Sequence, residues 1–176
     1  MNPETLAKSG TEHAHQTALF AWCAVARLYG FDVADDWAAG MGIEAAKSSR
    51  TNRTPVDALA WFHAVHNQGH AIRIRSTIVK AEGVRRGVPD TFLPWPVAHW
   101  HGLYIEMKKP TERPKTKGKG GVSDEQGAFG AYALRIGYGW SVCYSWREAA
   151  DTLRAYIEWN GASCIKFTPM AIETGL

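Results

Sequence analysis

The pattern of apolar and polar positions divides the chain into helices and short strands. Apolar residues recur with a helical period over 12–29, after the potential cap Thr11, and the pattern stops at Gly30. Two short apolar runs follow at 88–93 and 102–109, each broken by proline. Because only about eight residues join them, they predict an antiparallel hairpin with a loose loop.

Three further elements are expected toward the C-terminus. Ser123 and Gln126 stand at capping-box spacing at the start of a predicted helix that ends at Gly137. A short strand is predicted over 140–145, and a final edge strand over 163–167. Between them, an amphipathic helix over 145–159 is expected to turn four residues inward: Ala149, Leu153, Tyr156 and Ile157.

The order of helix, strands, helix, strand and helix predicts an α/β fold, with helices packed on a mixed central sheet. With 176 residues, 45% of them hydrophobic, the chain suits one well-buried core, so a single domain over 1–176 is expected. Its core would span about 12–159. The variable stretch at about 31–57 reads as an insert with a short helix near Pro55.

Composition excludes several classes of protein. No run approaches the length of a membrane span and no export signal opens the chain, so we expect a soluble, intracellular, cytoplasmic protein without membrane partners. The three cysteines, Cys23, Cys143 and Cys164, are far apart and are expected to be buried thiols rather than disulfide or zinc ligands. The net charge of +3 says little about partners.

The hairpin carries charges that its apolar pattern does not explain. Alternation along the second strand places Leu103, Ile105 and Met107 on one face and Tyr104, Glu106 and Lys108 on the other. Pairing of the strands would bring Asp90 near Glu106, so that two carboxylates could hold one Mg²⁺ or Mn²⁺ ion. Lys108 on the same face could then orient or deprotonate a water and stabilise charge on phosphorus.

Two other interpretations of these residues are open. Asp90 could be a turn residue, with Glu106 and Lys108 on a solvated strand face, since this spacing is common by chance. A pair of carboxylates also serves glycosidases, but that chemistry leaves the lysine and the adjacent basic stretch unexplained. The combination of all three residues with that stretch favours phosphodiester hydrolysis.

The basic stretch over 108–119 holds six cations and a single acid, Glu112. It reads as a flexible loop that could contact DNA phosphates without reading sequence, although a solvated charge run is the common alternative. The residues expected to bind DNA are Lys109, Arg113, Lys115, Lys117, Lys119, Arg85 and Arg86, and Arg73 and Arg75 could extend the set.

Histidines suggest a second kind of metal site. His63, His66 and His70 have a spacing that would suit a zinc or manganese hydrolase, and two more histidines lie in the hairpin loop. However, Asn67 and Gly69 form a turn signal among the first three, and no thiolate or acid completes the set. We therefore disfavour zinc.

Three ordered motifs carry a family resemblance: GVRRGVPDTFLP, HGLYIEMKKP and SDEQGAFGAYALRIGY. Together they resemble the VRR-NUC domain of the PD-(D/E)xK nuclease superfamily over about 12–159. The resemblance implies a restriction-endonuclease-like core, a mixed four-stranded sheet flanked by helices. It also implies Asp90 and Glu106 as metal-binding acids, the Met107 carbonyl as a further ligand, Lys108 as the catalytic lysine and Gln126 near the active site. Glu12 resembles an acidic position that contacts the metal directly or through water, and Gln16 and the segment HNQGH (66–70) also resemble family positions.

The resemblance extends the expected function. Stand-alone phage and bacterial proteins of this type are similar to Holliday junction resolvases that act as homodimers, so a metal-dependent, structure-selective endodeoxyribonuclease without a nucleotide cofactor is expected. The alternatives are a less selective nuclease for flaps or linear DNA, and a catalytically silent nuclease-like DNA-binding module. An apolar face at Trp146, Tyr156 or Trp159, or on the first helix, is a candidate dimer interface.

Overall fold

The computed structural model describes residues 1–51, 53–65, 83, 85–115 and 121–160. Its helices are α1 (Pro3–Ala7), α2 (Glu12–Tyr29), α3 (Phe31–Ala38), α4 (Ile43–Ser49), α6 (Asp124–Arg135) and α7 (Trp146–Ile157), with 3₁₀ turns η1 (Asp57–Trp61) and η2 (Pro110–Glu112). The strands are β1 (His63–Ala64), β2 (Thr91–Leu93), β3 (Leu103–Met107) and β4 (Gly139–Cys143). The predicted strand over 163–167, Cys164, and the positions 66–70, Arg73 and Arg75 lie outside the described residues.

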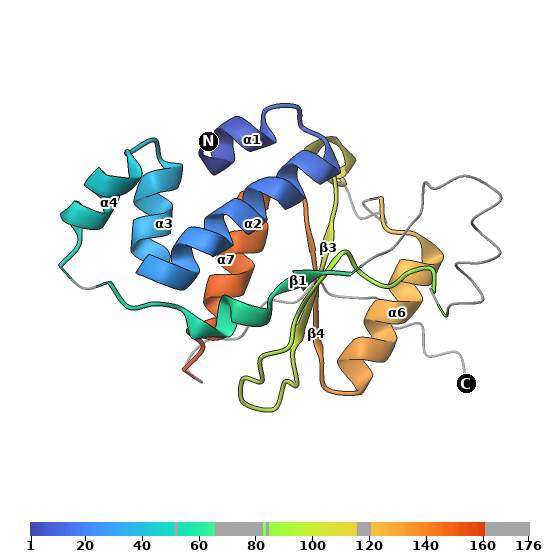
Figure 1. Cartoon of the computed structure of the whole chain (residues 1–176). Helices are drawn as coiled ribbons and strands as arrows, with labels where there is room; N and C mark the ends of the chain where they lie inside the picture. The colour runs from blue at the N-terminus through green and yellow to red at the C-terminus, as the bar shows by residue number, and fades with distance from the viewer. Residues whose placement is uncertain (52, 66–82, 84, 116–120, 161–176) are drawn as a thin grey trace.

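The four strands form one mixed sheet in the order β1-β2-β3-β4. β1 and β2 pair antiparallel, as do β2 and β3, which confirms the predicted hairpin, while β3 and β4 are parallel. Helices α2 and α7 cover one side of the sheet and α6 lies on the other (Figure 1). The predicted α/β class, with a mixed four-stranded sheet flanked by helices, is therefore confirmed.

Side chains of β3 alternate between two hydrophobic clusters. Leu103, Ile105 and Met107 are fully buried in the cluster that includes α2 and α7. Tyr104 instead packs with Trp140 and helix α6. Since the two sets point to opposite sides of the sheet, the alternation predicted from the sequence is correct.

Helix ends follow the local signals of the sequence. Thr11 caps α2, and Gly30 ends it with a φ of 93°. Ser123 caps α6 in a capping box with Gln126, and Ser145 caps α7. These three helices were predicted from the sequence. Their starts are visible there because polar caps are preferred where the first backbone N–H groups of a helix lack partners.

The strands are shorter than predicted. β2 begins only at Thr91, because the Asp90 side chain, rather than a strand ladder, takes the Met107 backbone N–H. β3 ends at Met107, although Lys108 N still donates to Cys143 O at 2.9 Å. β4 begins one residue before the predicted range and ends at Cys143.

The stretch 31–57 holds more helix than expected. It forms α3 and α4, while the expected helix near Pro55 is only the 3₁₀ turn η1. The Asp35 carboxylate accepts hydrogen bonds from Trp22 on α2 and from Arg147 and Arg154 on α7. These contacts attach α3 to the core. Because they join residues far apart in the chain, no local sequence pattern predicts them.

Burial corrects one expectation and confirms another. Trp146 and Tyr156 are buried inside the chain and do not offer an exposed dimer face, because they fill the core between α7 and the sheet. Cys23 and Cys143 are buried free thiols, as predicted. No helix within the described residues is long and apolar enough to cross a membrane.

Candidate active site

The site is built on the β2–β3 hairpin. Asp90 directly precedes β2, and its Oδ2 accepts a hydrogen bond of 2.8 Å from the Met107 backbone N–H on β3. Its own carbonyl accepts one of 2.7 Å from Val65 N, just past β1. These contacts fix the Asp90 carboxylate beside the end of β3. Burial raises its pKa, against the lowering effects of the Met107 hydrogen bond and the charge of Lys108.

Glu106 is the most buried acid of the site, with an exposed fraction of 1%. Burial and the nearby charge of Asp90 raise its pKa to about 8, although Lys108 opposes the shift. Its Oε1 accepts hydrogen bonds from Gln126 and Lys108, whereas the buried Oε2 has no hydrogen-bond partner among the residues that the structure describes. A buried oxygen without a donor is costly unless a proton or a cation satisfies it.

Gln126 is oriented by the same residues that begin α6. Its side-chain Oε1 accepts from Ser123 N at 2.9 Å, and Ser123 Oγ accepts from Gln126 N at 3.2 Å. Since the amide oxygen is used in this capping box, the Nε2 group points to Glu106, to which it donates. Gln126 therefore both caps α6 and donates to Glu106, which places its side chain beside the candidate site.

Lys108 lies beside Glu106, with Nζ 2.8 Å from Oε1. It is buried, with 7% of its surface exposed. Burial alone would lower its pKa, but the ion pair with Glu106 and the charges of Glu12 and Asp90 outweigh this and raise the pKa. Lys108 is thus a fixed ammonium group that donates hydrogen bonds at the site.

Glu12, on the first turn of α2, belongs to the same electrostatic group. Burial and the charge of Asp90 raise its pKa, while Lys108 lowers it. However, among the described residues no three His, Cys, Asp or Glu side chains are close enough to form a metal-binding set. The structure therefore places Glu12 near the site without joining it to Asp90 and Glu106 as a third ligand.

The residues of the site suit a hard divalent cation. Such ions prefer carboxylate and carbonyl oxygens, often only one or two protein carboxylates with water and phosphate oxygens completing the shell. Glu106 Oε2 is a buried acceptor in need of a positive partner, and Asp90 is held nearby. Asp90, Glu106 and the Met107 carbonyl would hold the ion.

Comparisons with known proteins give one structural similarity. No family model and no curated protein matches the chain. A solved structure described as "VRR_NUC domain protein" shares 20% sequence identity with this chain at a TM-score of 0.45, over 62% of this chain and 78% of that one. Its description names the family that the sequence motifs resemble.

The expected DNA-binding cations fall into different environments. Lys109, Lys115, Arg85 and Arg86 are exposed, and Lys117 and Lys119 lie outside the described residues. Arg113 is paired with Glu148, and its guanidinium lies 4.8 Å from the centre of the Tyr144 ring. Part of the predicted flexible loop is instead a 3₁₀ turn at Pro110–Glu112, where Glu112 accepts from Lys109 N. The first residues of the basic stretch are therefore held in a defined turn.

Two positioning features were missed by sequence reasoning. The pairing of Arg113 with Glu148 joins residues 35 apart, so no local pattern indicates it. Gly87 has a φ of 83°, and a Cβ atom there would lie 2.5 Å from the Glu125 backbone. This close approach holds the segment before Asp90 against the first turn of α6. The glycine of GVPD was the available signal, but its contact required the fold.

The histidines do not form a second centre in the described part of the chain. His63 is exposed on edge strand β1, and its Nδ1 contacts Trp61 O at 2.7 Å. His66 and His70, its expected partners, lie outside the described residues. His99 and His101 are exposed in the β2–β3 loop.

Proposed function

We propose that the protein is a metal-dependent endodeoxyribonuclease. The observation that carries the proposal is the buried pair of Glu106 and Lys108, with Asp90 anchored to the same strand. One Glu106 oxygen has no donor in the described part of the chain. A solvated strand face would not bury both side chains. A buried acid and a buried lysine beside a half-buried second acid are typical of a reactive site.

Each residue has a role in the proposed hydrolysis. Asp90, Glu106 and the Met107 carbonyl hold Mg²⁺ or Mn²⁺, which when bound supplies Lewis acid chemistry to the phosphodiester. Lys108, protonated because of its raised pKa, orients the attacking water by donation and stabilises negative charge on the phosphate oxygens. Gln126 holds the Glu106 carboxylate in place by donating to Oε1. Glu12 adds negative charge at the edge of the site, and a metal there would be within its reach only through water.

Branched DNA is the substrate that we propose, in particular a four-way junction cut by a homodimer. Two active sites related by a two-fold axis would match the approximate two-fold symmetry of a junction. The exposed cations Lys109, Lys115, Arg85 and Arg86 support binding to phosphates without base readout. The dimer itself is tested by the mass of the protein in solution, which should be about twice that of the chain.

Cleavage assays test the proposal. Labelled four-way junction, flap and linear duplex are incubated with the protein in Mg²⁺, Mn²⁺ or EDTA. We expect metal-dependent cleavage with preference for the junction, and a loss of about 100-fold or more in Glu106→Ala and Lys108→Ala. Glu44→Ala, an exposed acid on α4, is the matched control and should cut like the wild type.

The possible outcomes separate the alternatives. Cleavage that persists in EDTA or in Glu106→Ala would exclude the metal mechanism. Metal-dependent cutting of all substrates alike would keep the mechanism and remove the junction preference. DNA binding without cleavage in either metal would identify a catalytically silent module.

A further inference from the structure

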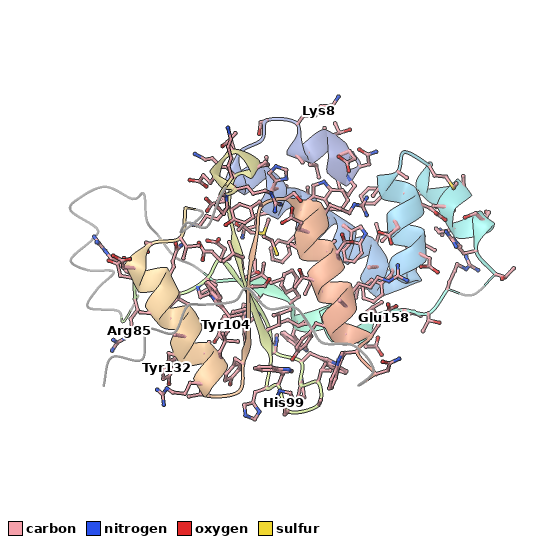
Figure 2. The ribbon with its side chains drawn as sticks, turned by 180° about the vertical axis from the view of Figure 1, so that it is seen from behind. Lys8, Arg85, His99, Tyr104, Tyr132 and Glu158 are labelled. Atoms are coloured by element: carbon pink, nitrogen blue, oxygen red, sulfur yellow. The ribbon has the colours of Figure 1, made fainter. Side chains whose placement is uncertain are left out.

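A groove of about 590 Å³ runs beside α6 and has no role in the proposed hydrolysis. It is lined by residues from the segment before β2 and from α6: Arg85, Arg86, Val88, Glu125, Ala128, Phe129 and Tyr132. Figure 2 shows Arg85 and Tyr132 beside α6, at the end of the molecule opposite α3 and α4. The groove is therefore separate from the helical insert.

The charge of the groove is positive. Arg85 and Arg86 are exposed on one wall, and Glu125 is the single acid among the described residues of the lining. A third guanidinium, that of Arg135, lies 5.4 Å from the centre of the Tyr132 ring. The two guanidinium groups of the lining complement the phosphates of a nucleic acid strand, and Arg135 adds a cation beside Tyr132.

The other wall is aromatic. Tyr132 is 50% exposed, an unusual degree for a large ring on a helix that packs against a sheet. Phe129, one turn earlier, packs edge-on against Tyr104 of β3 with ring centres 5.0 Å apart, which holds it in place. A fixed aromatic wall with an exposed ring is the surface on which unpaired bases stack in proteins that bind single strands.

The groove is connected to the candidate active site through two segments. Arg86 is followed by Gly87, which packs against the first turn of α6, and then by Asp90 three residues later. On the other side, Gln126 on α6 donates to Glu106. Tyr132 follows Gln126 by six residues, or about 9 Å along a helix.

We propose that this groove binds unpaired DNA, with a base stacked on Tyr132 and the adjoining phosphates paired with Arg85 and Arg86. The inference rests on the proposed function in taking DNA as the substrate, and it adds the structural class that the enzyme selects. Duplex DNA keeps its bases stacked inside the helix, so the aromatic wall favours bases that are unpaired at the branch point of a junction or in a flap.

Binding measured in EDTA tests the groove independently of cleavage. Fluorescein-labelled oligothymidine and a labelled hairpin duplex are titrated with the protein, and anisotropy gives the two affinities. We expect Tyr132→Ala to weaken oligothymidine binding about 10-fold, with a much smaller effect on the duplex. Tyr132→Phe should retain the affinity, because the ring is kept. Arg85→Ala with Arg86→Ala should weaken both ligands and reduce the salt dependence of binding.

Tyr29 supplies the matched control. It lies under a cation as Tyr132 does, with Lys47 Nζ 4.9 Å from its ring centre, but on α2 beside α4. Tyr29→Ala should leave both affinities unchanged. Tyr132→Leu keeps apolar bulk without the aromatic ring, so it should show the same loss as Tyr132→Ala if stacking, rather than packing, is responsible.

The results distinguish this inference from the nuclease proposal. Equal oligothymidine affinities for the wild type, Tyr132→Ala and Tyr132→Leu would contradict the proposal that the groove binds unpaired DNA, even if the protein cuts DNA. A loss in Tyr132→Ala that Tyr132→Leu restores would also overturn it, because packing would then explain the effect. Ring-dependent binding in a protein that cleaves nothing would support the groove and remove the nuclease proposal.

Discussion

The surroundings of Glu106 raise its pKa and favour the protonated form of its carboxyl group. Burial and the charge of Asp90 raise its pKa to about 8 despite the opposing Lys108 ammonium, so protonation competes with the ion pair at neutral pH in the metal-free protein. An unfolded chain releases that proton near the ordinary value of 4.5. The folded state therefore binds more protons between these two values, and the group makes the free energy of unfolding fall as pH rises through this window.

Substitution by glutamine removes this dependence. Relative to the wild type in EDTA, Glu106→Gln should become more stable from pH 5 to pH 8, by at most about 1.4 kcal/mol per pH unit, and the difference should level off above pH 8. Urea unfolding at several pH values measures this. Glu44→Gln, an exposed acid, should show no such trend. A difference that is constant with pH would mean that Glu106 is ionised throughout.

Gly87 offers a second test at the residue scale. Its φ of 83° and the 2.5 Å that would separate an alanine Cβ from the Glu125 backbone make alanine unfavourable for two reasons. Gly40 has a φ of 104° but open space around it, so Gly40→Ala has only the conformational cost, about 1–2 kcal/mol. Gly87→Ala should lose about 1–3 kcal/mol more in urea unfolding, because the segment must move away from α6. Equal losses would show that the close approach is unimportant.

At the scale of elements, the Asp35 carboxylate joins three helices. It accepts from Trp22 Nε1 at 3.0 Å and from Arg147 and Arg154, both at 2.9 Å. Asp35→Asn should lower the free energy of unfolding by about 2 kcal/mol after allowance for solvent screening of a partly exposed group. Asp36→Asn, which affects an exposed pair with Arg50, should cost less than about 1 kcal/mol. Similar losses of unfolding free energy in the two variants would mean that Asp35 does not attach α3 to α2 and α7.

The elements that were predictable are those whose signals are local. Thr11 and Gly30 mark α2, and the capping box of Ser123 and Gln126 marks α6, because caps act within one helical turn. The strand faces of β3 followed from alternation. Helices α3 and α4 were missed. For α3 the reason is that Asp32 and Asp35 pair with Arg154 on α7, a contact that leaves no local pattern in the sequence.

The candidate site was predictable to the same extent. Strand alternation placed Glu106 and Lys108 on one face, and hairpin pairing brought Asp90 to β3. The burial of Glu106 and Lys108 was not predictable, because it depends on how α6 covers the sheet. The same holds for the Glu106 oxygen that has no partner among the described residues. The aromatic wall at Tyr132 was hidden for a similar reason, since an exposed tyrosine has no distinct pattern in sequence.

At the scale of the whole molecule, metal binding and folding should be coupled. A ligand that binds only the folded state adds stability by mass action, about 2.7 kcal/mol at one hundred times its Kd. Mg²⁺ or Mn²⁺ should therefore raise the melting temperature by several degrees, and EDTA should reverse the shift. Because Glu106 must release its proton to bind the ion, the shift should be larger at pH 8.5 than at pH 6.5.

Variants show whether this stabilisation comes from the candidate site. Glu106→Gln cannot supply a second carboxylate, so its melting temperature should respond little to metal at either pH. Glu44→Gln should respond like the wild type, since Glu44 pairs only with Lys47 among the described residues. A metal-induced shift that is the same at both pH values and persists in Glu106→Gln would place the ion elsewhere. A pH-dependent shift lost only in Glu106→Gln would identify Glu106 as the ligand whose proton the metal displaces, independently of any DNA substrate.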